Sequence, residues 1–152
     1  MSTPDYKAHL AELRANYVRA TPRQRLGIAR QRIANPEHGP NTLIAHVSAV
    51  EGFARCLAMH VGAKSQADLS ALYPAYRNMG PERLIEVYLS SQGLGEPSAY
   101  FGPELWQLFL YAIEYRNLLA HECTYLGQDM SPGLISACTS ILDALARSKG
   151  LQ

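Results

Sequence analysis

Proline follows Ser, Thr or Gly at several points along this chain, and these pairs restrict the fold more than any other feature. The pairs are Thr3-Pro4, Thr21-Pro22, Gly80-Pro81, Gly102-Pro103 and Ser131-Pro132. Proline is favoured in the first turn of a helix, where its missing N–H has no helical partner to lose, and a preceding Ser or Thr can cap that turn. Each pair therefore predicts the start of a helix, and the two prolines within residues 35–40 predict a break between helices.

Between these signals the apolar residues recur at helical spacing, without the alternation that is typical of strands. The predicted helices span approximately 4–19, 22–34, 41–64, 65–78, 81–93, 103–127 and 131–149. Hydrophobic residues make up 47% of the 152 residues, which is enough to form a core and argues against disorder. We therefore expect one all-α domain over 1–152, a bundle of four longer helices (core about 41–149) with shorter N-terminal and middle helices.

Positive charge is concentrated in the two predicted N-terminal helices, although the net charge of the whole chain is only +1. Six arginines follow one another with no acidic residue among them: Arg14, Arg19, Arg23, Arg25, Arg30 and Arg32. Such a stripe fits contact with phosphates or with an acidic partner surface, and we expect Arg23, Arg25, Arg30 and Arg32 to contact nucleic acid. A solvated helix face with no ligand is the alternative interpretation.

The cysteines and the N-terminal segment indicate the cellular compartment. Cys56, Cys123 and Cys138 form no C-x-x-C pair, so we expect reduced thiols and neither a disulfide framework nor a zinc site. The first residues are polar, and no uninterrupted apolar run of 18 residues occurs. We therefore expect a cytoplasmic protein with no membrane span, no metal and no organic cofactor.

The predicted helix 103–127 carries polar residues where its apolar stripe should continue. At about 3.6 residues per turn, one face consists of Trp106, Leu110, Ile113, Asn117, Ala120 and Thr124. Asn117 interrupts this face, and His121 and Arg116 lie at its borders. Burying such groups without partners costs roughly 1–3 kcal/mol each, so we expect partners or a pocket at this point.

Arg116, Asn117 and His121 together suit phosphate chemistry. A guanidinium binds phosphate oxygens in a bidentate manner and stays charged, and an imidazole exchanges protons near neutral pH. Asn117 stands one helical turn before His121, where it could orient the imidazole or donate to a phosphate oxygen. Such a set can cleave RNA without a metal, with the imidazole acting on the 2′-OH or the leaving 5′-oxygen and the guanidinium stabilising the charge that develops.

The segment Arg116-Asn117-Leu118-Leu119-Ala120-His121 resembles the Arg-x4–6-His motif of HEPN domains. The resemblance implies a helical bundle that dimerises and brings two motifs into one cleft, with Arg116, Asn117 and His121 catalytic. It further implies a metal-independent endoribonuclease of a toxin–antitoxin, phage-defence or RNA-processing system, with RNA and a cognate antitoxin as partners. The segment around Glu51 resembles the family's first core helix, in which an acidic residue often faces the cleft, and so adds Glu51 to the candidates.

Two other Arg-x4–6-His matches occur. The match from Arg32 to His38 contains Pro36 and cannot form one helix. The match from Arg55 to His60 has suitable spacing, but it lies on an earlier helix and Cys56 takes the place of the polar residue, so it ranks second.

The alternative for Arg116 is a structural ion pair, with Glu51, Glu86 or Glu114 as the partner. In that case the chain is a non-catalytic helical module that binds a protein or a nucleotide. The two interpretations differ in whether Arg116, Asn117 and His121 converge on an accessible groove.

Overall fold

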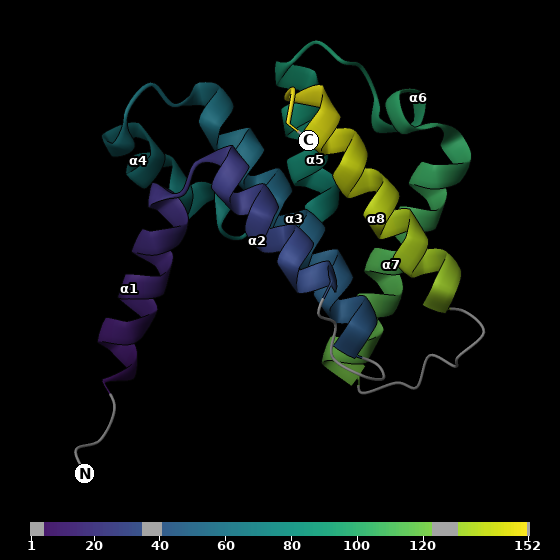
Figure 1. Ribbon diagram of the computed structural model, residues 1–152, viewed down its shortest axis with the longest axis horizontal. Helices are drawn as coiled ribbons and strands as arrows, with labels where there is room; N and C mark the ends of the chain where they lie inside the picture. The colour runs from purple at the N-terminus through teal and green to yellow at the C-terminus, as the bar shows by residue number, and fades with distance from the viewer. Residues whose placement is uncertain (1–4, 35–40, 123–130, 152) are drawn as a thin grey trace.

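The computed structural model describes residues 5–34, 41–122 and 131–151, which form eight α-helices and no strand (Figure 1). The helices are α1 (Tyr6–Arg19), α2 (Pro22–Ala34), α3 (Asn41–Gly62), α4 (Gln66–Tyr76), α5 (Pro81–Ser91), α6 (Pro97–Phe101), α7 (Pro103–Glu122) and α8 (Ser131–Ser148). The predicted all-α fold is confirmed. The likeness to HEPN domains stays a prediction.

Side-chain caps explain where the first two helices begin. Thr21 Oγ1 accepts a hydrogen bond from the Gln24 backbone N–H at 3.2 Å, and Gln24 Oε1 accepts one from the Thr21 N–H at 2.9 Å. This reciprocal capping box satisfies two N–H groups that a helix start leaves unpaired, and α2 begins at Pro22 as predicted. The N-cap of α1 is Asp5, whose carboxylate accepts the Ala8 N–H at 3.0 Å.

The remaining predictions of helix ends differ from the structure in small ways. Ser65 caps α4 as predicted, and α3 ends at Gly62, two residues before the predicted end. The short α6 was not predicted, because its five residues have no hydrophobic periodicity. The predicted end of α7 at Gly127 lies outside the described residues.

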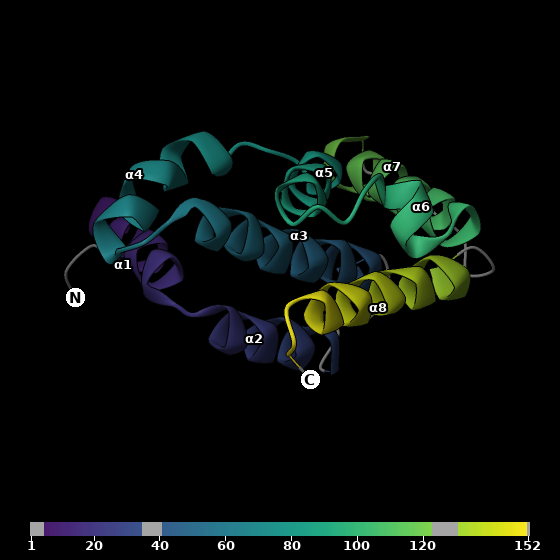
Figure 2. The same ribbon diagram turned by 90° about the horizontal axis from the view of Figure 1, so that it is seen from above.

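Helix α3 runs through the centre of the molecule, and most of the other helices pack around it (Figures 1 and 2). On one side, α3 contacts α5, α7 and α8, and α7 also packs along α8. Helix α2 covers α3 near α8. At the other end of the molecule, α4 packs on α3 and supports α1.

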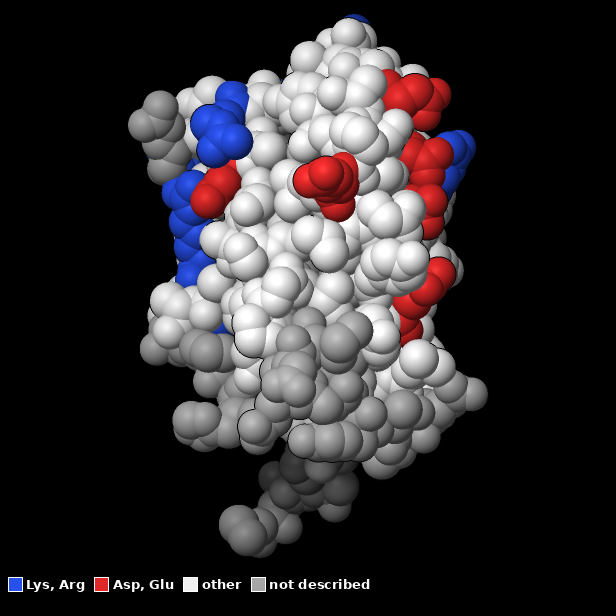
Figure 3. All heavy atoms as spheres, turned by 90° about the vertical axis from the view of Figure 1, so that its right-hand side faces the viewer, with Lys and Arg blue, Asp and Glu red and all other residues white. Residues whose placement is uncertain are grey.

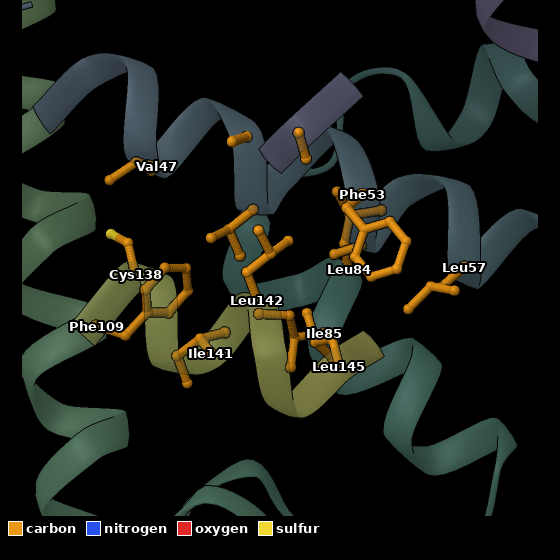
Figure 4. Close-up of a cluster of buried hydrophobic side chains, with 14 of the residues drawn as sticks. Val47, Phe53, Leu57, Leu84, Ile85, Phe109, Cys138, Ile141, Leu142 and Leu145 are labelled. Atoms are coloured by element: carbon orange, nitrogen blue, oxygen red, sulfur yellow. The ribbon is translucent and has the colours of Figure 1, made fainter. Parts of the chain in front are cut away.

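The four helices α3, α5, α7 and α8 supply the bulk of the core (Figure 4). Its largest fully buried side chains are Tyr88, Phe53, Phe109, Leu43, Leu57, Met59, Leu84, Ile85, Leu89, Ile141, Leu142 and Leu145. The apolar stripes predicted on α3, α5 and α8 account for most of this set. Packing of the apolar stripe of each helix against its neighbours stabilises a bundle of this kind.

The face of α7 that enters the core differs from the predicted one. Phe109 and Ala112 are fully buried, whereas Asn117 is exposed. The core face is therefore turned by about one residue, so that Arg116 and not Asn117 lies toward the interior. The prediction was wrong because α7 has large apolar residues around much of its circumference, including the exposed Leu108 and Tyr111, and periodicity alone then does not select a face.

Helix α3 is long and apolar enough, by length and composition, to cross a membrane over Thr42–Gly62. In this fold 67% of its most apolar window is buried among the other helices. A central core helix passes the same test, so its hydrophobicity is accounted for by its place in the bundle.

The two described cysteines lie inside the protein, and we expect neither to react in the folded state. Burial raises the pKa of the Cys56 thiol and of the Cys138 thiol to about 12, against the opposing effects of Arg25 and Arg116 respectively. Because the thiolate is the reactive form, iodoacetamide at pH 8 should leave both unmodified in buffer and alkylate both in urea. Peptide mass spectrometry measures this, and modification of either in the native protein would contradict the prediction.

Candidate functional site

An ion pair between α3 and α7 joins two of the predicted site residues. Arg116 Nη2 lies 3.7 Å from Glu51 Oε1, with 15% and 22% of the two side chains exposed. The two residues meet because α7 packs along α3 with its rotated core face inward. A largely desolvated guanidinium needs such an anionic partner, since burying it alone is costly.

The other carboxylate oxygen of Glu51 faces a second arginine. Arg55 Nη2 lies 3.7 Å from Glu51 Oε2, one helical turn away on α3. Arg55 also donates to the carbonyl oxygens of Tyr76 at 3.0 Å and Met79 at 2.9 Å, and so ties the end of α4 to α3. Glu51 thus lies between two arginines, a cluster that we call the Arg–Glu–Arg cluster.

These contacts give the rival Arg55–His60 match a structural role. The guanidinium of Arg55 is engaged by Glu51 and two backbone carbonyls. His60 Nδ1 donates to the Cys56 carbonyl oxygen of its own helix at 2.9 Å. Both side chains thus have hydrogen-bond partners within the chain.

A groove of about 490 Å³ opens between α5 and α7 beside the cluster. It is lined by Gly80, Pro81, Glu82, Arg83, Glu86, Ile113, Arg116 and Asn117. Arg116 forms part of the wall and donates from Nε to Asn117 Oδ1 at 2.9 Å. Asn117 therefore orients the guanidinium at the groove, a different role from the predicted support of His121.

His121 lies apart from this groove near the end of α7. Its side chain is exposed and makes no hydrogen bond or ion pair within the part of the chain that the structure describes. Five residues of α-helix separate Arg116 from His121 by about 7.5 Å along the axis and about 140° around it. The structure brings Arg116, Asn117 and Glu51 together, and within one copy it does not bring His121 to them.

The predicted basic stripe does not form one continuous surface. Arg25 turns inward, with its guanidinium carbon 4.5 Å from the centre of the Tyr17 ring. Arg30 pairs with Asp143 of α8 at 3.4 Å. Of the four arginines expected to contact nucleic acid, Arg23 and Arg32 are exposed, and Arg32 has an interaction of its own. The Arg30 side chain is 41% exposed within its pair with Asp143.

Sequence reasoning missed several parts of this site. Glu82 and Arg83 line the groove because α5 and α7 both pack against α3, and no local sequence pattern predicts this arrangement. Glu86, which the sequence offered only as a possible ion-pair partner of Arg116, lines the same groove. The pairing of Glu51 with Arg55 had a readable signal, since an acidic and a basic residue four apart share a helix face.

Within residues 5–34, 41–122 and 131–151, no three His, Cys, Asp or Glu side chains are placed together to hold a metal ion. Comparison with models of known protein families, with curated proteins and with solved structures finds no match to this chain. The fold and site thus define an all-α bundle with an Arg–Glu–Arg cluster beside an open groove.

We expect the loss of the Glu51 charge to loosen the junction of α3 and α7. Glu51→Gln keeps the shape of the side chain but leaves two poorly solvated guanidiniums without an anion, which should lower the free energy of unfolding by about 2–3 kcal/mol. Urea unfolding followed by circular dichroism measures the change. Asp143→Asn is the matched control, because it breaks only the exposed pair with Arg30 and should cost less than about 1 kcal/mol. Equal losses in the two variants would contradict a special role for the cluster.

Proposed function

We propose that this protein is a metal-independent endoribonuclease that cleaves RNA at a composite site formed across a homodimer. The observation that carries the proposal is the contact between Arg116 and Glu51 at the wall of a groove. These residues lie far apart in the chain, and the likeness to HEPN domains selected each from a different segment. By the same likeness the protein acts in the cytoplasm as a toxin, a phage-defence component or an RNA-processing component, with a cognate antitoxin as a further partner.

In the proposed reaction the 2′-oxygen of a ribose attacks the adjacent phosphorus and the bond to the 5′-oxygen of the next nucleotide breaks. The imidazole of His121 removes the 2′-OH proton, and the imidazolium so formed gives that proton to the leaving 5′-oxygen. The products are a 2′,3′-cyclic phosphate and a free 5′-OH. Arg116, oriented by Asn117 and Glu51, binds the phosphate oxygens and stabilises the charge that grows on them.

The need for a second copy follows from the geometry of α7. Because Arg116 and His121 point about 140° apart, one copy does not present both to the same phosphate. A dimer that sets two α7 helices side by side would place His121 of each copy near the groove of the other. His121 is exposed and has no partner in the described residues, as such a role requires.

The experiment that tests the proposal is cleavage of RNA by the purified protein in the presence of EDTA. Cleavage should yield 2′,3′-cyclic phosphate ends, and Arg116→Lys should reduce it, because Lys keeps the charge but loses the bidentate contact. Absence of cleavage over a panel of single-stranded and structured RNAs would contradict the proposal.

A second candidate function, a non-catalytic helical module that binds a protein or nucleotide, is favoured by two observations. The guanidinium of Arg116 already has intrachain partners, and the groove walls carry the carboxylates of Glu82 and Glu86, which repel a phosphate backbone. For such a module, Arg116→Ala lowers stability and no nuclease activity exists to lose. A stability loss together with inactive wild-type protein would select this function over the first.

A further inference from the structure

Helix α1 projects from the bundle with an uncovered apolar stripe. Its residues from Tyr6 to Arg14 are all exposed, and only its C-terminal end packs against other helices. Three large apolar side chains line one face of the projecting part, which we call the arm stripe: Tyr6, Leu10 and Leu13, exposed by 69%, 50% and 51%. A helix this short is marginal in water without a packing partner, and large apolar side chains in solvent gain free energy when covered.

A second uncovered stripe runs along the outer face of α7. It consists of Leu108, Tyr111, Tyr115 and Leu118, of which only Tyr115 is partly covered by the core. We call it the α7 stripe. Figure 3 shows the side of the molecule on which α7 and α8 lie, with a mostly uncharged area that an acidic side chain interrupts, between a mainly acidic edge and a mainly basic edge.

The two stripes match in spacing. Steps of four and then three residues separate the three members of the arm stripe, and the same steps separate Tyr111, Tyr115 and Leu118. Steps of three and four are what two helices need to pack along a common seam. A parallel alignment brings Leu10 opposite Tyr115. The same alignment brings Tyr6 opposite Tyr111 and Leu13 opposite Leu118.

The two stripes also lie in regions of opposite charge. Residues 5–34 hold seven Lys or Arg and two Asp or Glu, a net charge of +5, whereas residues 81–122 hold six Glu and two Arg, a net charge of −4. In the parallel alignment, Arg14 beside the arm stripe falls next to Glu114 beside the α7 stripe. Two arm helices paired with each other would instead bring Lys7 and Arg14 close to like charges or to neutral side chains.

The stripes do not meet within one copy, because α1 and α7 lie on opposite sides of the molecule (Figures 1 and 2). We propose that α1 of one copy docks along the α7 stripe of a second copy. The contact buries both apolar stripes and neutralises facing charges. It needs no ribonuclease activity: association that depends on Leu10 without RNA cleavage supports this contact alone, and association with cleavage that does not depend on Leu10 supports the proposed reaction alone.

Sedimentation velocity over a range of protein concentrations tests the contact in the full chain. The wild type should associate, and Leu10→Asp should weaken association at least tenfold. Ile28→Asp is the matched control: Ile28 is exposed to a similar extent, 47%, but belongs to neither stripe, so this variant should associate like the wild type. Leu10 makes no core contact, and unchanged thermal unfolding of a dilute sample would show that the variant is folded.

Charge reversal provides an independent readout of the same pairing. Arg14→Glu and Glu114→Arg should each weaken association, and the double variant should recover most of the loss, because the facing charges are again opposite. A monomeric wild type at all concentrations, an unaffected Leu10→Asp variant, or a double variant no better than the single ones would overturn the proposal.

Discussion

Replacing His121 with alanine is expected to lower the rate of RNA cleavage by about 100-fold to 10,000-fold, the contribution of a general acid or base. His121 is the histidine of α7, five residues after Arg116, and its side chain has no structural partner within the described residues. Its loss should leave RNA affinity and the unfolding transition nearly unchanged. Initial cleavage rates of a labelled RNA, with binding measured separately in a non-cleavable 2′-deoxy analogue, separate these effects.

The matched control for His121 is His9→Ala. His9 is also an exposed helical histidine, and it lies on α1, across the molecule from α7. This variant should cleave at the wild-type rate. Undiminished cleavage by His121→Ala would remove His121 from the mechanism, and equal losses in both variants would point to a general effect of histidine removal.

Replacing Phe109 with alanine should lower the free energy of unfolding by about 3–5 kcal/mol, the usual cost of emptying a fully buried aromatic site. The ring lies in the core with side chains of α8 and α3 around it (Figure 4). Its removal leaves a cavity that rigid helices on several sides do not close. The free energy of unfolding of a small domain is about 5–15 kcal/mol, so the variant should be close to unfolding at 37 °C.

Urea unfolding of the Phe109→Ala variant measures this loss, and Ile28→Ala provides the comparison. Ile28 is 47% exposed on α2 and should change stability by less than about 0.5 kcal/mol when truncated. A loss below about 1 kcal/mol for Phe109→Ala would mean that the core of the bundle is loosely packed at this point.

The local structure of this chain was predictable because local chemistry determines it. Thr21 caps α2, Ser65 caps α4 and Pro103 opens α7 as predicted, since a cap depends on residues three or four positions away. The stripes of α3, α5 and α8 were predictable because each of these helices has one apolar face. Helix α7 has apolar residues on several faces, so its orientation depended on its neighbours.

The candidate site was predictable only in part, for the same reason. Side-chain chemistry and resemblance selected Arg116, Asn117 and Glu51 from the sequence. The distances between these residues could not be predicted from it. Asn117 was expected to support His121 and instead accepts a hydrogen bond from Arg116. The four expected nucleic-acid contacts were read from charge alone, which does not reveal that Arg25 stacks on Tyr17 or that Arg30 pairs with Asp143.

The sequence by itself determined the helical class, most helix starts and the apolar stripes. These follow from interactions within a few residues along the chain. Only the tertiary structure decided which way α7 faces, that Glu51 lies between Arg55 and Arg116, and that α5 forms the far wall of a groove. Such facts depend on packing between segments distant in sequence, where small rotations of a helix exchange a buried residue for its exposed neighbour.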